Sequence, residues 1–421
     1  MGIDPFGRLA ARTEPLRGGG RGWVLLTVAA GWFVTLGLRF VVPALLPYIK
    51  DTFTVGNAAA GFAVTVIWVT YAGMQLPAGV LSDSLGERRL LTASLFLAGG
   101  SLLLFSVFPV FALFLLAAGL FGLGTGLYGP ARGLVLSRTF RDNDGTAFGL
   151  TLAAGSIGSA VLPFVATQVT EAAGWEIALA AFAPLFFVLG AGVWWAVPPK
   201  SAVETVTARS TGEAREEETD GGADRERTLS AVVGAATRRR VVVATLGATF
   251  MLFTLQGLTA FYTTYLVETK AFAETTAASL FALLFLVGAG FQFFSGRATD
   301  RYGHRRVLVA LALLGIPPLV AFPLVEGRLA IMALTAVLAV RIGVSPVVNA
   351  YVVSVIPAHV RGTTWGVVRT VFFGIGATGS LAVGFVADAG LFDVAMYGLA
   401  ALTLPAVFIF AVLPDRAGQP K

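Results

Sequence analysis

Long apolar runs recur along the whole sequence and constrain its fold more than any other feature. They extend from Trp23 to Leu413, and each is close to the ~20 residues that a helix needs to cross the hydrocarbon layer of a membrane. Of the 421 residues, 56% are hydrophobic and 13% are charged, a balance far from that of a water-soluble domain. The sequence therefore predicts an all-α membrane protein with twelve transmembrane helices.

The apolar runs form two groups of six on either side of a charged segment. Charged and Pro/Gly-rich breaks delimit spans at 23–48, 58–80, 90–108, 111–136, 146–167, 176–197, 241–266, 276–296, 306–325, 329–356, 364–386 and 393–413. We expect five parts: a cytoplasmic N-terminal arm (1–22), a six-helix bundle (23–197), a cytoplasmic charged linker (198–240), a second six-helix bundle (241–413) and a cytoplasmic tail (414–421). The arm and most of the linker have the composition of disordered segments.

The positive charges predict the orientation in the membrane. Short cytoplasmic loops hold an excess of arginine and lysine. If the N-terminus lies inside, the outer loops carry only Lys50, Lys270 and Arg328. We therefore expect a multi-pass protein of the plasma membrane with both termini in the cytoplasm.

A loop motif occurs twice, once in each half of the chain. Segments 79–89 and 296–306 both fit G-x-x-x-D-x-x-G-x-R-R, and they follow the second and eighth spans. The same offset in residue number pairs Gln75 with Gln292 and Tyr48 with Tyr265. The repeat predicts a duplicated six-helix unit.

The repeated loop resembles the signature loop of the major facilitator superfamily, and the resemblance extends over the whole chain. The first copy departs from the usual pattern at Ser84, where a basic residue normally follows the aspartate. The resemblance implies a 6+6 fold with pseudo-two-fold related halves that moves a solute by alternating access. Charges in the two loops would form a latch that closes in one state and breaks in the other. The latch residues are Gly79, Asp83, Gly86, Arg88, Arg89, Gly296, Asp300, Arg301, Gly303, Arg305 and Arg306.

Deeply placed arginines are the leading candidates for substrate contacts, because leaving a charge in lipid costs several kcal/mol. At about 1.5 Å per residue, Arg39 lies roughly 24 Å along the first helix from Trp23. Arg341 lies near the centre of the tenth span, whereas Arg132 and Arg369 are nearer cytoplasmic ends. The middle of each predicted span lacks Asp, Glu and His. Such a pocket would be positive and would attract an organic or inorganic anion.

Each candidate also has a purely structural interpretation. Arg39 and Arg341 would bond to carbonyls of broken helices, and Arg132 and Arg369 would reach to the cytoplasmic interface. Buried amides often only join helices. The predicted substrate-binding residues are Arg39, Arg341, Arg132, Arg369, Gln75, Gln256, Tyr71 and Asn349. Anion-carrying members of the resembled family place an arginine in the first helix, and those for organophosphates repeat it in the seventh. The repeat offset gives Gln256 there, which argues against a phosphorylated substrate.

Other function classes remain as alternatives or are excluded. The segment 75–79 is also similar to multidrug exporters, which makes efflux of lipophilic compounds the main alternative; a passive channel and a transporter-like sensor are more remote. The fifth span contains Gly149, Gly155 and Gly158, and the eleventh contains Gly374, Gly376 and Gly379. We expect these glycines to allow close helix packing, and we do not count them as support for efflux. The chain has no cysteine and no H-E-x-x-H motif, so we predict no enzyme, cofactor or metal site.

The expected partners follow from this function. They are a small-molecule solute, the lipid bilayer, and a coupling ion (proton or sodium) or a counter-solute. The basic charge does not indicate nucleic acid, because it is distributed over membrane loops. A monomer is expected, since the duplication supplies both halves within one chain.

Overall fold

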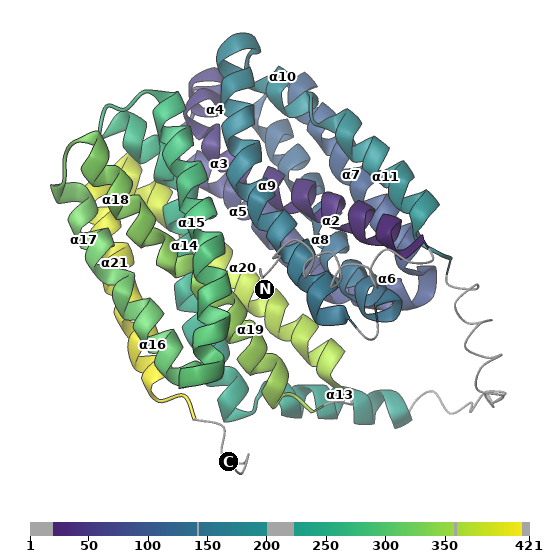
Figure 1. Ribbon diagram of the computed structural model, residues 1–421. Coiled ribbons are helices and arrows are strands. Elements are labelled where there is room, and N and C mark those ends of the chain that lie inside the picture. Colours follow the sequence, from purple (N-terminus) through teal and green to yellow (C-terminus); the bar gives the residue numbers. More distant parts are fainter. Residues whose placement is uncertain (1–19, 141–142, 200–222, 358–359, 415–421) are drawn as a thin grey trace, which may run out of the picture.

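The computed structural model describes residues 20–140, 143–199, 223–357 and 360–414. Within these ranges the regular structure is helical, and twelve helical segments are long and apolar enough to cross a membrane (Figure 1). The all-α fold with twelve spans is therefore confirmed. Most of the predicted N-terminal arm, linker and tail, namely residues 1–19, 200–222 and 415–421, lies outside the described residues.

The N-terminal half contains six spans, several of which are interrupted at glycine or proline. Its helices are α2 (Arg21–Gly37), η2 (Leu38–Phe40), α3 (Val41–Ala44), α4 (Leu46–Phe53), α5 (Asn57–Gly73), α6 (Gln75–Leu85), α7 (Glu87–Val107), α8 (Phe111–Thr139), α9 (Asp144–Ala173), α10 (Trp175–Ala180) and α11 (Ala183–Ala196). The first span consists of α2, η2 and α3, and the second consists of α5 and most of α6.

The C-terminal half repeats this plan. Its helices are α13 (Ala223–Ala236), α14 (Arg239–Glu268), α15 (Glu274–Tyr302), α16 (His304–Leu314), α17 (Ile316–Leu324), α18 (Arg328–Leu338), η3 (Ala339–Gly343), α19 (Val344–Val355), α20 (Arg361–Asp388) and α21 (Phe392–Ala411). Helix α13 belongs to the segment assigned to the linker and lies across one end of the bundle in Figure 1. The described part of the linker is therefore more ordered than its composition predicted.

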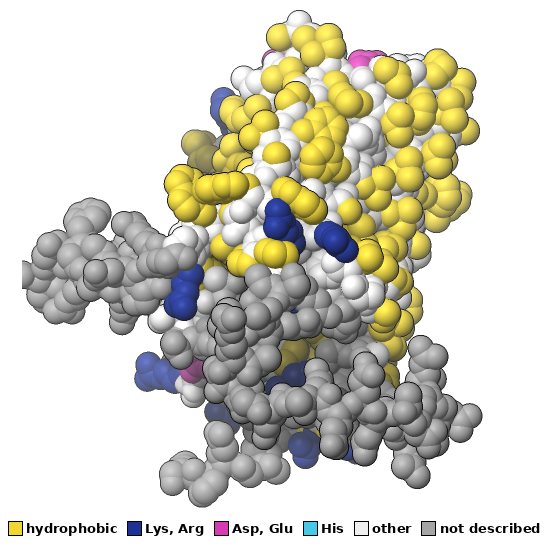
Figure 2. All heavy atoms as spheres, turned by 90° about the vertical axis from the view of Figure 1, so that its right-hand side faces the viewer, with side chains coloured by type: hydrophobic (Ala, Val, Ile, Leu, Met, Phe, Trp, Pro, Cys, Tyr) yellow, Lys and Arg dark blue, Asp and Glu magenta, His cyan; other side chains and the backbone are white. Residues whose placement is uncertain are grey.

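The lateral surface of the protein is apolar. Figure 2 shows hydrophobic side chains over the length of one face, with Lys and Arg side chains gathered toward one end. Large apolar side chains such as Leu324, Leu329, Phe408 and Trp195 are at least two-thirds exposed. Exposure on this scale would be costly in water but is favourable against hydrocarbon.

Two of the predicted glycine contacts bring helix backbones together. A Cβ atom at Gly158 would collide with the backbone of α2, and one at Gly379 would collide with the backbone of α14. Gly149 and Gly374 have no such neighbour within 4 Å, so close packing explains only part of the set. The close crossing of α14 and α20 at Gly379 lies beside an apolar groove between the same two helices.

The two halves are tied together at the end that the charge distribution places outside. The Asp388 carboxylate, at the end of α20, accepts hydrogen bonds from the backbone N–H groups of Asn57 and Ala58, the latter at 2.9 Å, at the start of α5. Lys50 pairs with Glu268 at 2.6 Å. In Figure 1 the halves lie close near α4 and diverge toward the end that carries α13. The two halves are thus joined at the end where α4 and the start of α5 lie.

The Asp388 contact predicts a measurable effect on this junction between the halves. A carboxylate at a helix N-terminus satisfies free N–H groups and favours the helix dipole. We expect Asp388→Asn to shift the protein toward an outward-open state by about 1–2 kcal/mol, or about 5- to 30-fold. Because the chain has no native cysteine, Thr264→Cys provides a single buried reporter on α14. Its rate of labelling by a membrane-impermeant maleimide measures opening.

Asp51 supplies the matched control for this experiment. It is an exposed acidic residue at the same end, and Asp51→Asn removes the same charge. Labelling should rise in Asp388→Asn and stay at the parent rate in Asp51→Asn. Equal rates in all three proteins would show that the Asp388 contact does not hold the outer end closed.

Candidate substrate site

Tyr71 lies at the centre of a cluster of arginines and aromatic rings between the two halves. It is on α5 and is 1% exposed. Its hydroxyl accepts a hydrogen bond of 3.0 Å from Nη2 of Arg369, which is on α20 in the other half. The next residues on the two helices are also joined, because the Thr370 hydroxyl donates to the carbonyl of Ala72 at 3.1 Å. Tyr71, which belongs to the N-terminal half, is therefore hydrogen-bonded to the C-terminal half.

Arg39 lies against the opposite side of Tyr71, in the short 3₁₀ segment η2 of the first span. Such a tightened turn inside a helix often marks a functional position. The guanidinium carbon lies 4.1 Å from the centre of the Tyr71 ring and 4.9 Å from that of Trp68. Nε donates to the carbonyl of Thr35 at 3.0 Å, while Nη2 is buried without a partner. The arginine is held by ring faces and keeps one donor free.

Arg132 of α8 completes the group of three arginines. Its guanidinium carbon lies 4.1 Å from the centre of the Trp32 ring, which also lies 5.4 Å from the guanidinium carbon of Arg39. Nε and Nη1 of Arg132 are buried without partners. The indole Nε1 of Trp32 is likewise unpaired. The Trp32 ring thus contacts two guanidinium groups, and its Nε1 edge packs against Gly155 of α9.

Gln75 and Gly129 border the same cluster. The Gln75 amide nitrogen donates to the carbonyls of Tyr71 at 3.1 Å and Gly126 at 3.4 Å, while its oxygen is buried without a partner. A Cβ atom at Gly129 would lie 3.7 Å from the Tyr71 hydroxyl and 3.8 Å from the Gln75 oxygen. An alanine there is accommodated at ordinary contact distance. A larger side chain would enter the cluster.

The electrostatic balance of the site is positive. Among the described residues, no carboxylate forms an ion pair with Arg39, Arg132 or Arg369. Buried donors without partners cost about 1–3 kcal/mol each, and more when they are charged. An anion that accepted these hydrogen bonds would remove that cost. We refer to Arg39, Arg132, Arg369, Tyr71 and Trp32 as the arginine cluster.

Arg341, the other arginine predicted to be deep, lies elsewhere. It is in η3 of the C-terminal half and is 2% exposed. Nη1 donates to the Thr403 hydroxyl at 3.2 Å and to the Gly315 carbonyl at 3.5 Å, and Nη2 donates to the Thr254 hydroxyl. No residue of the arginine cluster is among its described partners. Its Nε is buried without a partner in the described residues, as are donors of Arg39 and Arg132, but its three hydrogen bonds all lie within the C-terminal bundle.

The remaining predicted contacts are also in the C-terminal half. Gln256 is on α14, is 2% exposed and has an unpaired amide nitrogen. Asn349 is on α19 and is partly buried. In the described part of the chain, neither is hydrogen-bonded to the arginine cluster.

Sequence reasoning identified Tyr71 but missed three other aromatic residues of the site, Trp32, Trp68 and Phe373. Trp32 lies two helical turns before Arg39, and Trp68 lies one turn before Tyr71, so each pair shares a helix face. Phe373, one turn after Arg369, lies with its ring centre 5.2 Å from that guanidinium carbon. In the sequence, each of these aromatic residues lies three, four or seven residues from a predicted site residue, and this spacing could have indicated them.

The two signature loops have the same backbone turn. Gly86 and Gly303 both have a φ near 80° (80° and 82°), which favours glycine, and each follows the end of a helix. This equivalence agrees with the predicted duplication. The Arg88 guanidinium lies 4.2 Å from the centre of the Trp194 ring, and Arg138 pairs with Glu87.

Most of the charged residues of the predicted latch are exposed at the protein surface in this structure. The exposed members are Arg89, Asp300, Arg301, Arg305 and Arg306. The Asp83 side chain lies outside the described residues. The latch therefore stays a prediction.

Comparison with known proteins gives relatives over most of the chain. Residues 27–379 and 245–421 match the model of the Major Facilitator Superfamily. The chain is 23% identical over 403 residues to the MFS-type transporter YfnC of Bacillus subtilis (strain 168), which covers 93% of both chains. It is 28% identical over 278 residues to the cyanate transport protein CynX of Escherichia coli (strain K12), which covers 65% of both chains.

Solved structures share the fold at low sequence identity. A bacterial homologue of the human lysosomal transporter Spinster, in an inward-facing and unoccupied conformation, superimposes with a TM-score of 0.77 at 14% identity, covering 94% of this chain and 97% of that one. The nucleoside transporter NupG gives a TM-score of 0.75 at 14% identity, covering 93% and 99%. The arrangement of two six-helix halves is therefore that of known transporters.

Proposed function

Because the chain belongs to the major facilitator superfamily of transporters, we propose that it is a secondary transporter that carries a small organic or inorganic anion by alternating access. The observation that carries this proposal is the arginine cluster. Three guanidinium groups surround Tyr71, and no described carboxylate neutralises them. The alternative of lipophilic-compound efflux gains no comparable support, because a lipophilic cation would be repelled by this cluster.

The free donors favour an anion with more than one acceptor atom. Several guanidinium nitrogens are buried and have no hydrogen-bond partner among the described residues, namely Nη2 of Arg39, Nε and Nη1 of Arg132 and Nε of Arg369. Guanidinium groups bind carboxylate and other oxyanions through paired hydrogen bonds. A carboxylate, an inorganic oxyanion or a linear anion such as cyanate fits this chemistry. The relative CynX is a cyanate transport protein, which supports this class of substrate.

The position of the cluster relates anion binding to movement of the two halves. Arg39 and Arg132 belong to the N-terminal half and Arg369 to the C-terminal half. An anion held by all three would draw the halves together at the level of Tyr71, where α5 and α20 meet. Differential binding of this kind is what lets a ligand shift a conformational equilibrium. The two signature loops keep their proposed role as a latch at the cytoplasmic end.

The other predicted contacts receive different roles. We assign Arg341 to stabilisation of the C-terminal bundle, since its described partners all lie there. Gln256 and Asn349 are secondary candidates for contacts in another state of the cycle. The charge rule continues to support cytoplasmic termini in the plasma membrane, with a coupling ion or a counter-solute as the energy source.

A ligand screen on the purified protein tests the proposal. A ligand that binds only the folded state stabilises it, by about 2.7 kcal/mol at 100 times Kd, and so raises the midpoint of thermal unfolding. The panel contains cyanate, inorganic phosphate, sulfate, mono- and dicarboxylates, and lipophilic cations. We expect a shift with one class of anion and none with cations. A shift with lipophilic cations alone would instead favour efflux.

Gly129 provides a matched pair of variants for this screen. Gly129→Leu would place a side chain against the Tyr71 hydroxyl and the Gln75 oxygen, and Gly129→Ala would reach them only at ordinary contact distance. The anion-induced shift should disappear in the leucine variant and persist in the alanine variant. A full shift in Gly129→Leu would place the anion away from the arginine cluster.

A further inference from the structure

A groove on the lateral surface of the C-terminal half has no role in the proposed transport path. Its volume is about 440 Å³, and its walls are almost wholly apolar. Lining residues include Val242, Leu246 and Thr249 of α14, Val371 and Ile375 of α20, and Leu402 of α21. Between 37% and 54% of the side-chain surface is exposed at Val242, Leu246, Val371, Ile375 and Leu402. The groove therefore opens toward the hydrocarbon around the protein.

The packing of α14 against α20 explains why the groove exists. The two helices touch closely where Gly376 meets the Leu252 side chain and Gly379 meets the backbone of Phe253. Toward the N-terminal end of α14 no such glycine contacts hold them together, and the space widens. Ala236, the last residue of α13, closes that end. The result is a wedge that is narrow at mid-membrane and capped near the cytoplasmic end.

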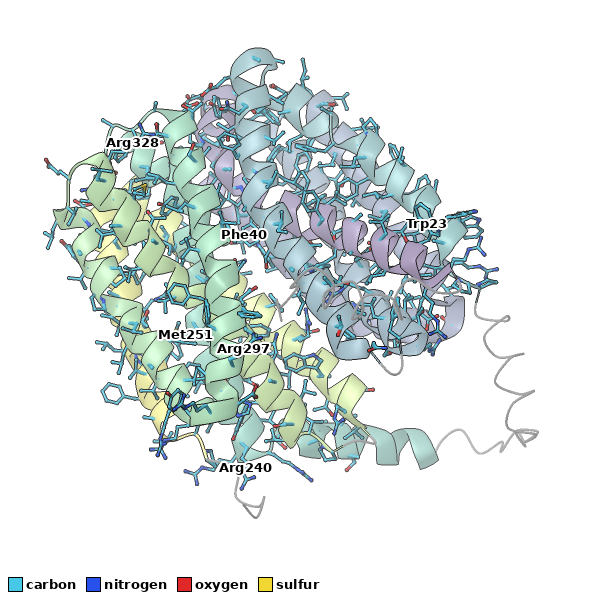
Figure 3. All side chains as sticks on the ribbon, in the orientation of Figure 1. Trp23, Phe40, Arg240, Met251, Arg297 and Arg328 are labelled. Atoms are coloured by element: carbon cyan, nitrogen blue, oxygen red, sulfur yellow. The ribbon has the colours of Figure 1, made fainter. Side chains whose placement is uncertain are left out.

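Three consecutive arginines lie beside the capped end. Arg238, Arg239 and Arg240 connect α13 to α14, and all three are exposed. Figure 3 labels Arg240 at the lower end of the bundle, beyond Met251 of the same helix. Val242, the first groove residue on α14, follows Arg240 after a single residue. A positive patch and an apolar groove thus adjoin within one helical turn.

Thr245 of α14 has a hydroxyl group without a hydrogen-bond partner in the described residues. Thr245 is one of the lining residues of the groove, and its hydroxyl oxygen is buried. Thr245 is five residues after Arg240, which is about 7.5 Å along the helix. In a phospholipid, the ester groups lie at this depth between the phosphate and the acyl chains. Along α14 the arginines come first, the apolar groove begins at Val242, and Thr245 lies within the groove.

We propose that this groove binds an anionic phospholipid of the inner leaflet, with an acyl chain between α14 and α20 and the phosphate at Arg238, Arg239 and Arg240. The three arginines favour an anionic lipid over a zwitterionic one, because each arginine near a negatively charged headgroup contributes about 1 kcal/mol. The site lies on α13 and α14, which join the two halves of the transporter. Bound lipid would hold the linker helix against the C-terminal bundle.

Lipid titration of the purified full-length protein in neutral detergent tests this site. The probes are phosphatidylglycerol and phosphatidylcholine with the same acyl chains, and the readouts are the midpoint of thermal unfolding and lipid retention in native mass spectrometry. We expect tighter binding of phosphatidylglycerol. The variant Arg238→Gln/Arg239→Gln/Arg240→Gln should lower its apparent affinity on the order of 100-fold. Affinity for phosphatidylcholine should change little.

Two further variants separate this site from general charge effects. Arg8→Gln/Arg12→Gln/Arg17→Gln removes the same charge from the N-terminal arm and should leave lipid binding intact. Leu246→Trp fills the groove without changing charge and should weaken retention of both lipids. Equal binding of the two lipids by the parent protein, or full phosphatidylglycerol binding by the Arg238–Arg240 variant, would overturn the proposal. These outcomes do not depend on whether the arginine cluster binds an anion.

Discussion

Arg39→Gln should abolish anion binding and transport while leaving the protein folded. Arg39 presents a buried guanidinium with a free Nη2 against the Tyr71 ring, and glutamine neither reaches this position with a charge nor keeps the paired donors. Loss of one partner from a buried, hydrogen-bonded charge pair costs about 2–5 kcal/mol, or about 30-fold to several thousand-fold in affinity. Anion-induced thermal shift and uptake into proteoliposomes measure the loss.

The thermal stability of the ligand-free protein separates a binding role of Arg39 from a structural one. In the empty site the guanidinium is desolvated and lacks a carboxylate, so its removal relieves an electrostatic cost. We expect the midpoint of Arg39→Gln without ligand to equal or exceed that of the parent. Arg39→Lys keeps the charge but loses the planar fork, and it should retain weak binding. Normal transport by Arg39→Gln would rule out the arginine cluster as the substrate site.

The fold followed from the sequence because the membrane allows so few structures. Backbone groups in hydrocarbon must be paired within the segment, so a long apolar run without charges has to be helical. The repeated loop around Asp83 and Asp300 then fixed the division into two halves. Helix α13 was missed, because the charges near its start hid the apolar positions Val232 and Ala235 that are buried against the bundle.

The site was only partly predictable, since depth along a helix does not give rotation about its axis. Arg39, Arg132, Arg369 and Tyr71 all came from the sequence, and the structure brings them together. Arg132 and Arg369 had been placed nearer the cytoplasm, yet a long side chain spans several ångströms and reaches inward as readily as outward. Arg341 has similar depth but faces the inside of its own bundle. Which side a buried arginine faces depends on tertiary packing that no single helix reveals.

Arg341→Ala, in contrast to Arg39→Gln, should lower stability and leave anion affinity unchanged. The Arg341 side chain fills the space between α14, α17 and α21 and donates to Thr254, Thr403 and the Gly315 carbonyl. Truncation leaves a cavity and an unpaired carbonyl, at a cost of about 2–5 kcal/mol. The measurement is the thermal midpoint without ligand, followed by anion titration of the protein that remains folded.

Arg341→Met tests how much of this stability comes from filling space. Methionine is flexible and apolar and would occupy much of the cavity, so we expect a smaller loss of stability than with alanine. Thr403→Val removes one of the acceptors while keeping the volume, and it should cost about 1 kcal/mol. If Arg341→Met instead kept full stability and lost anion binding, Arg341 would belong to the substrate path. The anion would then have to contact the C-terminal bundle well away from Tyr71, and the transport model would need two separate binding positions.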